Sequence, residues 1–368
     1  MLLSLYMIMI FAFKSDAFSS TSFFFNIQGC STNVATTPTE CDFNTFTCYW
    51  NNPDVTYSIP WFFNACSPNS NIYNPIDNQL YSNVINIPCT GISPISKYAY
   101  DFNSICSLFE IYAIQEYARQ LQPTGRIIML NMPTTCQWYG TGDQGCIDSK
   151  CSIWISTIAA IPTNTQYTVM TNTILHELGH TLNLNHASSS SYEYGDCSCI
   201  MGCASNAGTC YNAINTRLLN LSTPVADLTE IDLAIPKNYI VPIYTQNTQN
   251  HITITLDQMI PGWVLYLSAR SSDASPLGAD MNLDSRYDKV LSVHAYNPTL
   301  NPPFTYIIAL IEPNTNITFD NRNNFMLKYP AVGGILEKEI FNFTKSYLNI
   351  KLNSLANNIG ANILISLL

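Results

Sequence analysis

Three of the five histidines of this chain fall within eleven residues, in the run His176-Glu-Leu-Gly-His180-Thr-Leu-Asn-Leu-Asn-His186. On a helix, His176 and His180 are four positions apart, so both imidazoles leave the same face about one turn apart. His186 joins them only if the helix ends near Leu182 and the chain then turns back sharply. The run therefore predicts a helix followed by a tight reversal, with three histidines around one point.

This spacing suits a metal ion better than an ordinary surface helix. The first two imidazoles can bind one Zn²⁺, and three protein ligands leave a fourth position open, as in catalytic rather than structural zinc sites. Glu177 stands beside the ligands, where a carboxylate can take a proton from a water activated by the metal and later pass it to a leaving amine. Another face of the same helix carries Leu175, Leu178 and Leu182, which we expect to pack into the core.

The same run resembles a known signature. It is similar to the metzincin pattern HExxHxxGxxH, and Cys199-Ile-Met201-Gly202 follows at a distance suited to the Met-turn, a tight turn whose methionine packs beneath the metal. More narrowly, the chain resembles the gametolysin family (peptidase family M11) from about Phe24 to Val225. The segments that carry this resemblance are Tyr192-Glu-Tyr194-Gly-Asp-Cys-Ser-Cys-Ile-Met-Gly202, Cys210-Tyr-Asn212, Ile87-Pro-Cys89, Trp138-Tyr-Gly-Thr-Gly142 and Gly145-Cys146, with a looser likeness at Trp263–Arg270 and Tyr287–His294.

The resemblance implies a secreted zinc endopeptidase that degrades cell-wall or extracellular-matrix glycoproteins, so the expected partner is a protein or glycoprotein substrate. Carried over residue by residue, it implies that His176, His180 and His186 are the Zn²⁺ ligands, Glu177 the general base and Met201 the Met-turn residue. The alternative is a catalytically inactive metzincin-like protein that binds a surface or matrix. Proteolysis of unfolded substrates by the metal-loaded protein separates the two.

Two positions depart from the family pattern. Asn183 replaces the Gly that normally makes the turn before the third histidine, and Cys203 stands where some metzincins have a tyrosine near the metal. Asn tolerates the left-handed conformation better than other non-glycine residues, so we expect Asn183 to be left-handed and the metal site to be intact. Without that tyrosine, Glu177 and the metal must supply most of the charge stabilisation.

The composition excludes several other classes of protein. Of 368 residues, 47% are hydrophobic and 11% are charged, which suits a folded chain of about two domains and excludes disorder, a coiled coil and a collagen-like rod. The net charge of −10 gives no attraction to phosphate groups, so we expect no nucleic-acid partner and no binding to anionic membranes. We expect the protein to be a monomer.

The N-terminus predicts export. Met1–Phe13 is a short apolar run followed by the small-x-small site Ser15-Asp-Ala17, as in a secretory signal peptide, and it is too short to span a bilayer. All thirteen cysteines lie within residues 30–210, a density that indicates disulfides in an extracellular chain. We therefore expect secretion and no stable membrane span. The C-terminal run Ile359–Leu368 is predicted to be a final β-strand, with a lipid-anchor signal as the alternative.

Four cysteines around the Met-turn admit two interpretations. Cys197, Cys199, Cys203 and Cys210 can form disulfides or a second, structural zinc site, and an oxidising compartment favours disulfides. Because thirteen is odd, at least one thiol is unpaired or intermolecular. Triplets for N-glycosylation, compatible with secretion, begin at Asn220, Asn316 and Asn342.

Helical and strand patterns alternate in the first half of the chain. One helix is predicted from about Val169 to Leu182, and Arg126–Leu130 is predicted to be a buried strand. Ser152–Ser156 is a second strand, which we expect at a sheet edge where an extended substrate adds a strand. A further amphipathic helix is expected over residues 103–121, with these apolar residues on one face: Ile105, Leu108, Phe109, Tyr112 and Ala113.

After Pro224 the pattern is all-β. The expected strands are Tyr239–Val241, Ile252–Leu256, Trp263–Leu267, Val290–Val293, Tyr306–Leu310 and Tyr347–Leu352. The predicted organisation is a signal peptide at residues 1–17, a catalytic domain at 18–223 and an accessory domain at 224–368. The expected fold class is an α/β metzincin-like catalytic domain, with a mixed sheet and an active-site helix, followed by an all-β sandwich-like domain.

Overall fold

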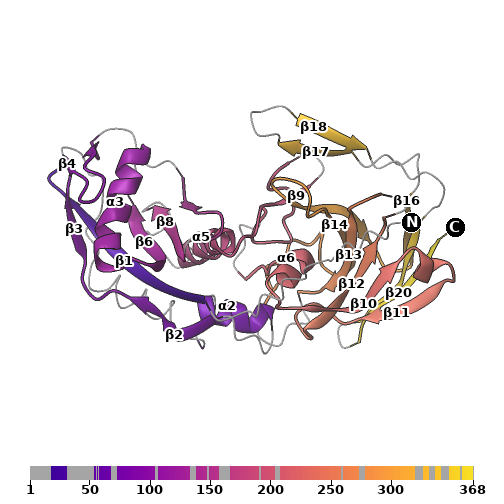
Figure 1. Cartoon of the computed structure of the whole chain (residues 1–368). Coiled ribbons are helices and arrows are strands. Elements are labelled where there is room, and N and C mark those ends of the chain that lie inside the picture. The colour runs from indigo at the N-terminus through magenta and orange to yellow at the C-terminus, as the bar shows by residue number, and fades with distance from the viewer. Residues whose placement is uncertain are drawn as a thin grey trace, which may run out of the picture.

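The computed structural model describes a mixed α/β protein with several sheets and few helices (Figure 1). The residues it describes are 18–30, 54, 56, 58–67, 73–103, 107–132, 138–146, 149–156, 166–189, 192–203, 208–257, 260–272, 278–319, 326–330, 336–340, 348–356 and 359–367. The predicted signal peptide, residues 1–17, lies outside these ranges. No helix in the described part of the chain is long and apolar enough to cross a membrane.

The first sheet has the strand order β2-β1-β6-β8-β7, and β3 also pairs with β1. Its strands are β1 (Phe18–Gln28), β2 (Tyr73–Leu80), β3 (Ile85–Pro88), β6 (Gly125–Met132), β7 (Gly140–Gly142) and β8 (Lys150–Ser156). All of these pairs are parallel except that of β7 with β8. The predicted strands at 126–130 and 152–156 are thus confirmed as β6 and β8.

Two helices are associated with opposite faces of this sheet because side chains alternate along its strands. In β6, Ile127 and Met129 share a core with α3 (Leu108–Leu121), whereas Ile128 and Leu130 share the other core with α5 (Gln166–Thr181). The second core also includes α2 (Ile59–Cys66). The helices expected over 103–121 and 169–182 therefore both form.

The buried face of α3 differs from the expected one. Ser107 caps the helix together with Glu110, so the helix begins at Leu108 rather than at residue 103. Ile111, Ile114 and Ala118, spaced by three and four positions, are buried. Of the residues expected on the buried face, only Ala113 is buried, Leu108, Phe109 and Tyr112 are exposed, and Ile105 lies outside the described residues.

The edge of the sheet also differs from the expectation. Ser152–Ser156 in β8 lies between β6 and β7, so it is not an edge strand. The edge is β7, where Gly140, Thr141 and Gly142 pair with Ile155, Trp154 and Ile153. A three-residue strand with two glycines carries no strand pattern, and for this reason the sequence did not indicate it.

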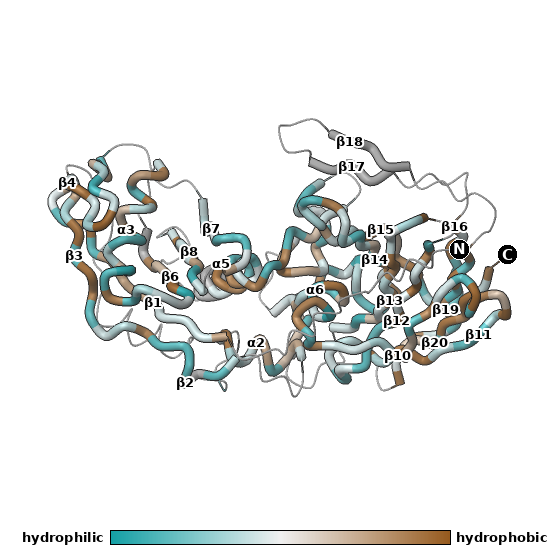
Figure 2. Tube along the Cα trace, viewed as in Figure 1, coloured by the Kyte–Doolittle hydropathy of each residue, from teal (hydrophilic) through white to brown (hydrophobic). Residues whose placement is uncertain are grey.

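The second half of the chain is built from strands. One sheet has the order β10-β12-β13-β14-β15-β9 and another the order β11-β20-β19-β16, and β17 pairs with β18 in a separate two-stranded sheet. Apolar side chains from both larger sheets share one core, and hydrophobic residues recur along these strands (Figure 2). The elements are β10 (Thr223–Thr229), β11 (Lys237–Val241), β12 (Gln249–Thr255), β13 (Val264–Arg270), β14 (Val290–Tyr296), β15 (Thr305–Ile311), β16 (Thr315–Phe319), β17 (Met326–Pro330), β18 (Leu336–Ile340), β19 (Leu348–Ala356), β20 (Gly360–Leu367) and the 3₁₀ helix Ile231–Leu233.

The strands predicted after Pro224 are confirmed as β11, β12, β13, β14, β15 and β19. The final strand is confirmed as well, because β20 pairs with β11 on one side and with β19 on the other. Two short strands, β4 (Thr90–Ile92) and β5 (Ala99–Asp101), form a separate pair.

The two halves meet around α5, α6 (Ala213–Leu218) and β9 (Ala187–Ser189), which Figure 1 shows between the two sets of strands. The strand β9 comes directly after His186 and pairs in parallel with β15 of the second half. The core around α5 likewise takes in Tyr244 and Tyr266 from the second half. The division at residues 223 and 224 into two domains stays a prediction.

Eight of the nine described cysteines form disulfides, as predicted. The four pairs are Cys30–Cys89, Cys66–Cys210, Cys146–Cys151 and Cys197–Cys203. Cys199 is free and buried, which accounts for an unpaired thiol. Among the described residues, the only group of three or more His, Cys, Asp or Glu side chains that could hold a metal ion is the histidine triad, so the cysteines form no second zinc site there.

Candidate metal centre

Helix α5 presents two of the three histidines. The rings of His176 and His180 have centroids 4.9 Å apart, one turn along the same face. Leu175 and Leu178 are buried in the core on another face, as predicted. The packing of these leucines fixes the rotation of the helix and hence the direction of both imidazoles.

Asn183 makes the reversal after α5. Its φ is 67°, so the prediction of a left-handed residue is confirmed. The Asn183 N–H donates to His180 O at 2.8 Å, and the Leu184 N–H donates to Gly179 O at 2.9 Å. These bonds satisfy the last carbonyls of the helix while the chain turns back.

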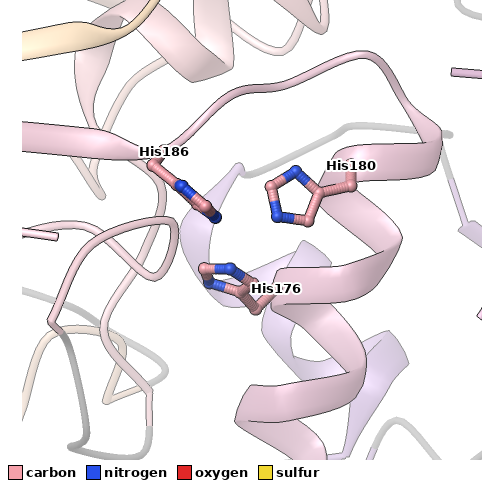
Figure 3. A group of neighbouring side chains, drawn as sticks. All are labelled: His176, His180 and His186. Atoms are coloured by element: carbon pink, nitrogen blue, oxygen red, sulfur yellow. The ribbon is translucent and has the colours of Figure 1, made fainter. Parts of the chain in front are cut away.

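The reversal brings His186 to the other two histidines, as Figure 3 shows. Its ring centroid lies 4.7 Å from that of His180 and 5.3 Å from that of His176. The three potential ligand atoms all lie within 4.8 Å of one another. The triad could therefore hold a metal ion.

Each imidazole has its Nδ1 atom engaged by a second group. Nδ1 of His176 lies 2.8 Å from Ile200 O, and Nδ1 of His180 lies 2.9 Å from Leu184 O. Nδ1 of His186 lies 2.5 Å from Oε1 of Glu193. An acceptor oxygen at Nδ1 favours the tautomer that carries its proton on Nδ1, and this leaves the Nε2 lone pair free for a metal, the usual arrangement of metal-binding histidines.

Sequence reasoning missed Glu193. The residue lies seven positions after His186, in a segment whose sequence indicates only the family resemblance. No rule of sequence spacing connects it to a ring nitrogen, because the contact depends on where the tertiary fold places Glu193 relative to His186.

The histidines are held in their neutral form. Burial and the neighbouring His180 lower the pKa of His176 to about 3, and the same two causes lower the pKa of His186 to about 3. Burial also lowers the pKa of His180. Because only a neutral imidazole can bind a metal, the centre is ready for an ion at neutral pH.

Glu177 lies beside the triad in one pocket of about 190 Å³, lined also by Gly140, Thr141, Gly142, Gln144 and Tyr194. Glu177 is 7% exposed. Burial raises the pKa of Glu177 to about 8. A carboxyl group whose pKa lies near neutrality can both accept and donate a proton under working conditions.

An aromatic side chain that sequence reasoning did not assign to the site covers His186. The ring of Tyr194 lies 4.1 Å from that of His186, centroid to centroid, and 6.0 Å from that of His176. Phe304 also stacks on His186, with an interplanar angle of 5° and a centroid distance of 6.1 Å. Contacts with two aromatic rings restrict the orientation of the third imidazole.

The loop of residues 196–203 packs against α5 at Gly179 and carries Met201, which is fully buried. The Ala187 N–H donates to Met201 O at 2.9 Å, which joins the loop to the strand after His186. Ile200 in the same loop accepts from His176. The predicted Met-turn residue thus lies in a segment that contacts His176 and the residue directly after His186.

A mixed α/β chain with a histidine triad that could hold a metal ion, and with a buried carboxylate beside it, has the features of the metallopeptidases. The chain belongs to the gametolysin peptidase M11 family, whose model matches residues 21–323. A curated relative, Autolysin of Chlamydomonas reinhardtii, is 22% identical over 323 residues, covering 66% of this chain and 49% of the relative. The chain spans about half the length of that relative, and no solved structure matches it.

Proposed function

We propose that the protein is a secreted zinc endopeptidase, with a metzincin-type catalytic domain at residues 18–223 and a β-sandwich accessory domain at residues 224–368. It acts as a monomer and hydrolyses peptide bonds of extracellular or cell-wall proteins and glycoproteins. One observation carries the proposal: three histidines, each with its Nδ1 atom engaged, share one pocket with the Glu177 carboxylate.

The donor set fits zinc. Three neutral imidazoles are a known ligand set of catalytic Zn²⁺, and an oxygen partner on each second nitrogen is typical of such ligands. His176, His180 and His186 would hold the ion through Nε2. When bound, the ion supplies Lewis-acid polarisation of the substrate carbonyl and lowers the pKa of water.

Glu177 is the general base in this proposal. Its carboxylate takes a proton from the attacking water and delivers it to the amine that leaves when the peptide bond breaks. Burial raises the pKa of the carboxyl to about 8, and a cation beside it favours the ionised form. The opposing effects keep both protonation states accessible near neutral pH.

The substrate binds extended along β7, the edge strand, and not along β8. A Cβ on Gly140 would lie 2.6 Å from Cγ2 of Thr173, and one on Gly142 would lie 2.9 Å from the Glu177 carbonyl oxygen. The two glycines therefore let β7 lie directly on α5, beside the pocket. A peptide that pairs with β7 gains main-chain hydrogen bonds and passes the histidines, with little demand on its sequence.

An extracellular location is supported by the four disulfides of the described residues and by the signal-like N-terminus. A cell-wall substrate suits the name of the relative, Autolysin.

The test uses the purified full chain. We expect about one zinc per molecule, cleavage of denatured casein and of an extracellular glycoprotein, loss of cleavage with chelator, and its return when zinc is added back. Glu177→Gln is the matched control, because it preserves the shape of the side chain but not its basicity. A zinc-loaded wild type that cuts no unfolded protein would favour the inactive binding protein instead.

A further inference from the structure

Charged side chains from the second half of the chain contact the 196–203 loop. Arg270 in β13 donates through Nη1 to Ser198 O and forms an ion pair with Asp280. The Arg270 Nε to Asp280 Oδ2 distance is 2.7 Å. Asp280 Oδ1 also accepts from the Cys210 N–H at 3.1 Å.

A second pair lies at the start of the same loop. His294 in β14 places Nε2 3.0 Å from Oδ2 of Asp196. The other oxygen of Asp196 accepts from the N–H and the hydroxyl of Ser198, at 3.0 and 2.6 Å. The Asp196 carboxylate therefore ties β14 to the loop and also fixes the shape of the loop.

All four charged or titratable side chains are buried: Arg270 is 1% exposed, and Asp196, Asp280 and His294 are 0% exposed. Burial opposes ionisation of Asp196, but His294 and the hydrogen bonds from Ser198 and Asn212 outweigh it and lower the pKa to about 2. Buried ion pairs add little stability compared with apolar packing, so they are poor evidence of a purely stabilising role.

His294 supports the same conclusion. Within the described part of the chain, its Nδ1 atom is buried without a hydrogen-bond partner, which costs stability. Its neighbours Val293 and Ala295 face the apolar core between the two large sheets, whereas His294 projects from the opposite face of β14 toward the loop. The residue is suited to orienting Asp196 rather than to packing.

The network continues to the third histidine. Asn212 Nδ2 lies 3.1 Å from Oδ2 of Asp196 and 2.9 Å from Oγ1 of Thr305. The Thr305 N–H in turn donates to His186 O at 3.3 Å. The second half of the chain therefore reaches both the loop that accepts from His176 and the backbone of His186.

We propose that Asp196, His294 and the Arg270–Asp280 pair form a buttress through which the second half of the chain positions the metal-binding histidines. These are positioning residues, since none of them lines the pocket. The consequence for metal binding and turnover rests on the proposed function, whereas the consequence for the 196–203 loop does not.

The test compares Asp196→Asn and His294→Gln with Ser292→Ala. Ser292 lies two positions before His294 on the same face of β14, is buried, and has a hydroxyl without a partner among the described residues, so it controls for any change in this strand. Hydrogen exchange is measured on the metal-free full chain. We expect peptides from the 196–203 loop to exchange roughly tenfold faster in the first two variants, with β19 and β20 unchanged, and no change in Ser292→Ala.

Zinc affinity is then measured by competition with a chromogenic chelator. We expect it to fall about 10- to 100-fold in Asp196→Asn and His294→Gln, with a lower kcat and a nearly unchanged KM for peptide cleavage. The double variant should lose no more than the worse single variant, because the two residues act as one unit. If Asp196→Asn fails to fold, His294→Gln carries the test.

If Asp196→Asn and His294→Gln fold and their 196–203 loop exchanges at the wild-type rate, the buttress proposal is wrong. Faster exchange with wild-type zinc affinity and kcat overturns its link to the metal centre. A wild type that binds no zinc and cuts nothing refutes the proposed function, and the exchange result still decides whether the second half holds the loop.

Discussion

Gly179 of α5 and Met201 of the 196–203 loop lie so close that a Cβ on Gly179 would be 2.4 Å from Sδ of Met201. No real Cβ can take that position, so the helix carries glycine where the loop passes beneath it. A glycine inside a helix lowers its stability by roughly 1 kcal/mol relative to alanine. Here the close packing of Met201 against the helix compensates for that loss.

Gly179→Ala should therefore destabilise the protein despite its higher helix propensity. We expect a loss of about 1–3 kcal/mol in the free energy of unfolding, typical of overpacking, together with weaker zinc binding. Urea unfolding and chelator competition measure the two effects. Adding Met201→Ala removes the obstructing sulfur, so the double variant should lose less than the sum of the single losses. Strict additivity would show that the two residues do not compete for this space.

Glu177→Ala should retain zinc and lose nearly all peptidase activity. The three histidines hold the metal, whereas the carboxylate handles the proton, so we expect kcat to fall at least about 10²- to 10⁴-fold. Metal analysis and cleavage of denatured casein give the two readouts. Joint loss of zinc and activity would contradict this division of roles. His186→Ala should show that joint loss, because two helical ligands hold the ion poorly.

Glu193→Ala should weaken zinc binding without removing a ligand. The carboxylate lies 2.5 Å from Nδ1 of His186 and orients that ring, and such partners are typically worth about 10- to 100-fold in metal affinity. Glu193→Gln retains an acceptor oxygen without the charge, so its affinity should fall between those of Glu193→Ala and the wild type. Equal affinities in all three proteins would mean that the contact does not orient His186.

Asn183→Gly should be neutral or slightly stabilising, because glycine adopts a φ of 67° without strain. Asn183→Val should cost at least about 1–2 kcal/mol and displace His186, since a β-branched residue resists the left-handed conformation. Thermal unfolding gives the stability, and zinc affinity reports the position of His186. A Val variant with unchanged zinc affinity would show that His186 does not depend on this turn.

The thiol of Cys199 should not react with iodoacetamide in the folded protein at pH 8. Burial, together with the nearby Asp196 carboxylate, raises its pKa to about 12, so the reactive thiolate is scarce at this pH. In urea the pKa returns to its ordinary range of about 8.5, and labelling should become fast. Peptide mapping assigns the label to this cysteine. Rapid labelling of the native protein would contradict the burial.

Much of the fold follows from local patterns in the chain. The predicted strands, the helix with the two histidines and the left-handed Asn183 all depend on neighbours within a few positions. The wrong expectations concern relations across the sheet. Ser152–Ser156 has the pattern of a strand, but whether a strand is an edge depends on what pairs beside it, and the short β7 gives no sign of itself. The expected face of α3 is also wrong, because the helix carries apolar residues on more than one side and the packing against the sheet buries Ile111, Ile114 and Ala118.

Sequence spacing predicts some residues of the site and not others. The spacing of His176, Glu177 and His180 places them on one helix turn, so their proximity could be predicted. Glu193 and Tyr194 meet His186 only through the tertiary fold, and Phe304 comes from the segment just before the distant strand β15. Contacts of this kind are decided by tertiary packing, which leaves no periodic trace in the sequence.

Because β9 pairs in parallel with β15, which comes more than a hundred residues later, the histidine site is completed late during synthesis of the chain. A ribosome delivers all three histidines well before it delivers Thr305, the residue that pairs with Ala187 and holds the backbone of His186. During synthesis the growing chain therefore carries the complete histidine signature while its last member still lacks its anchor. A chain cut short before β15 would keep the signature and lack the support, so the centre is completed only late in the making of the protein.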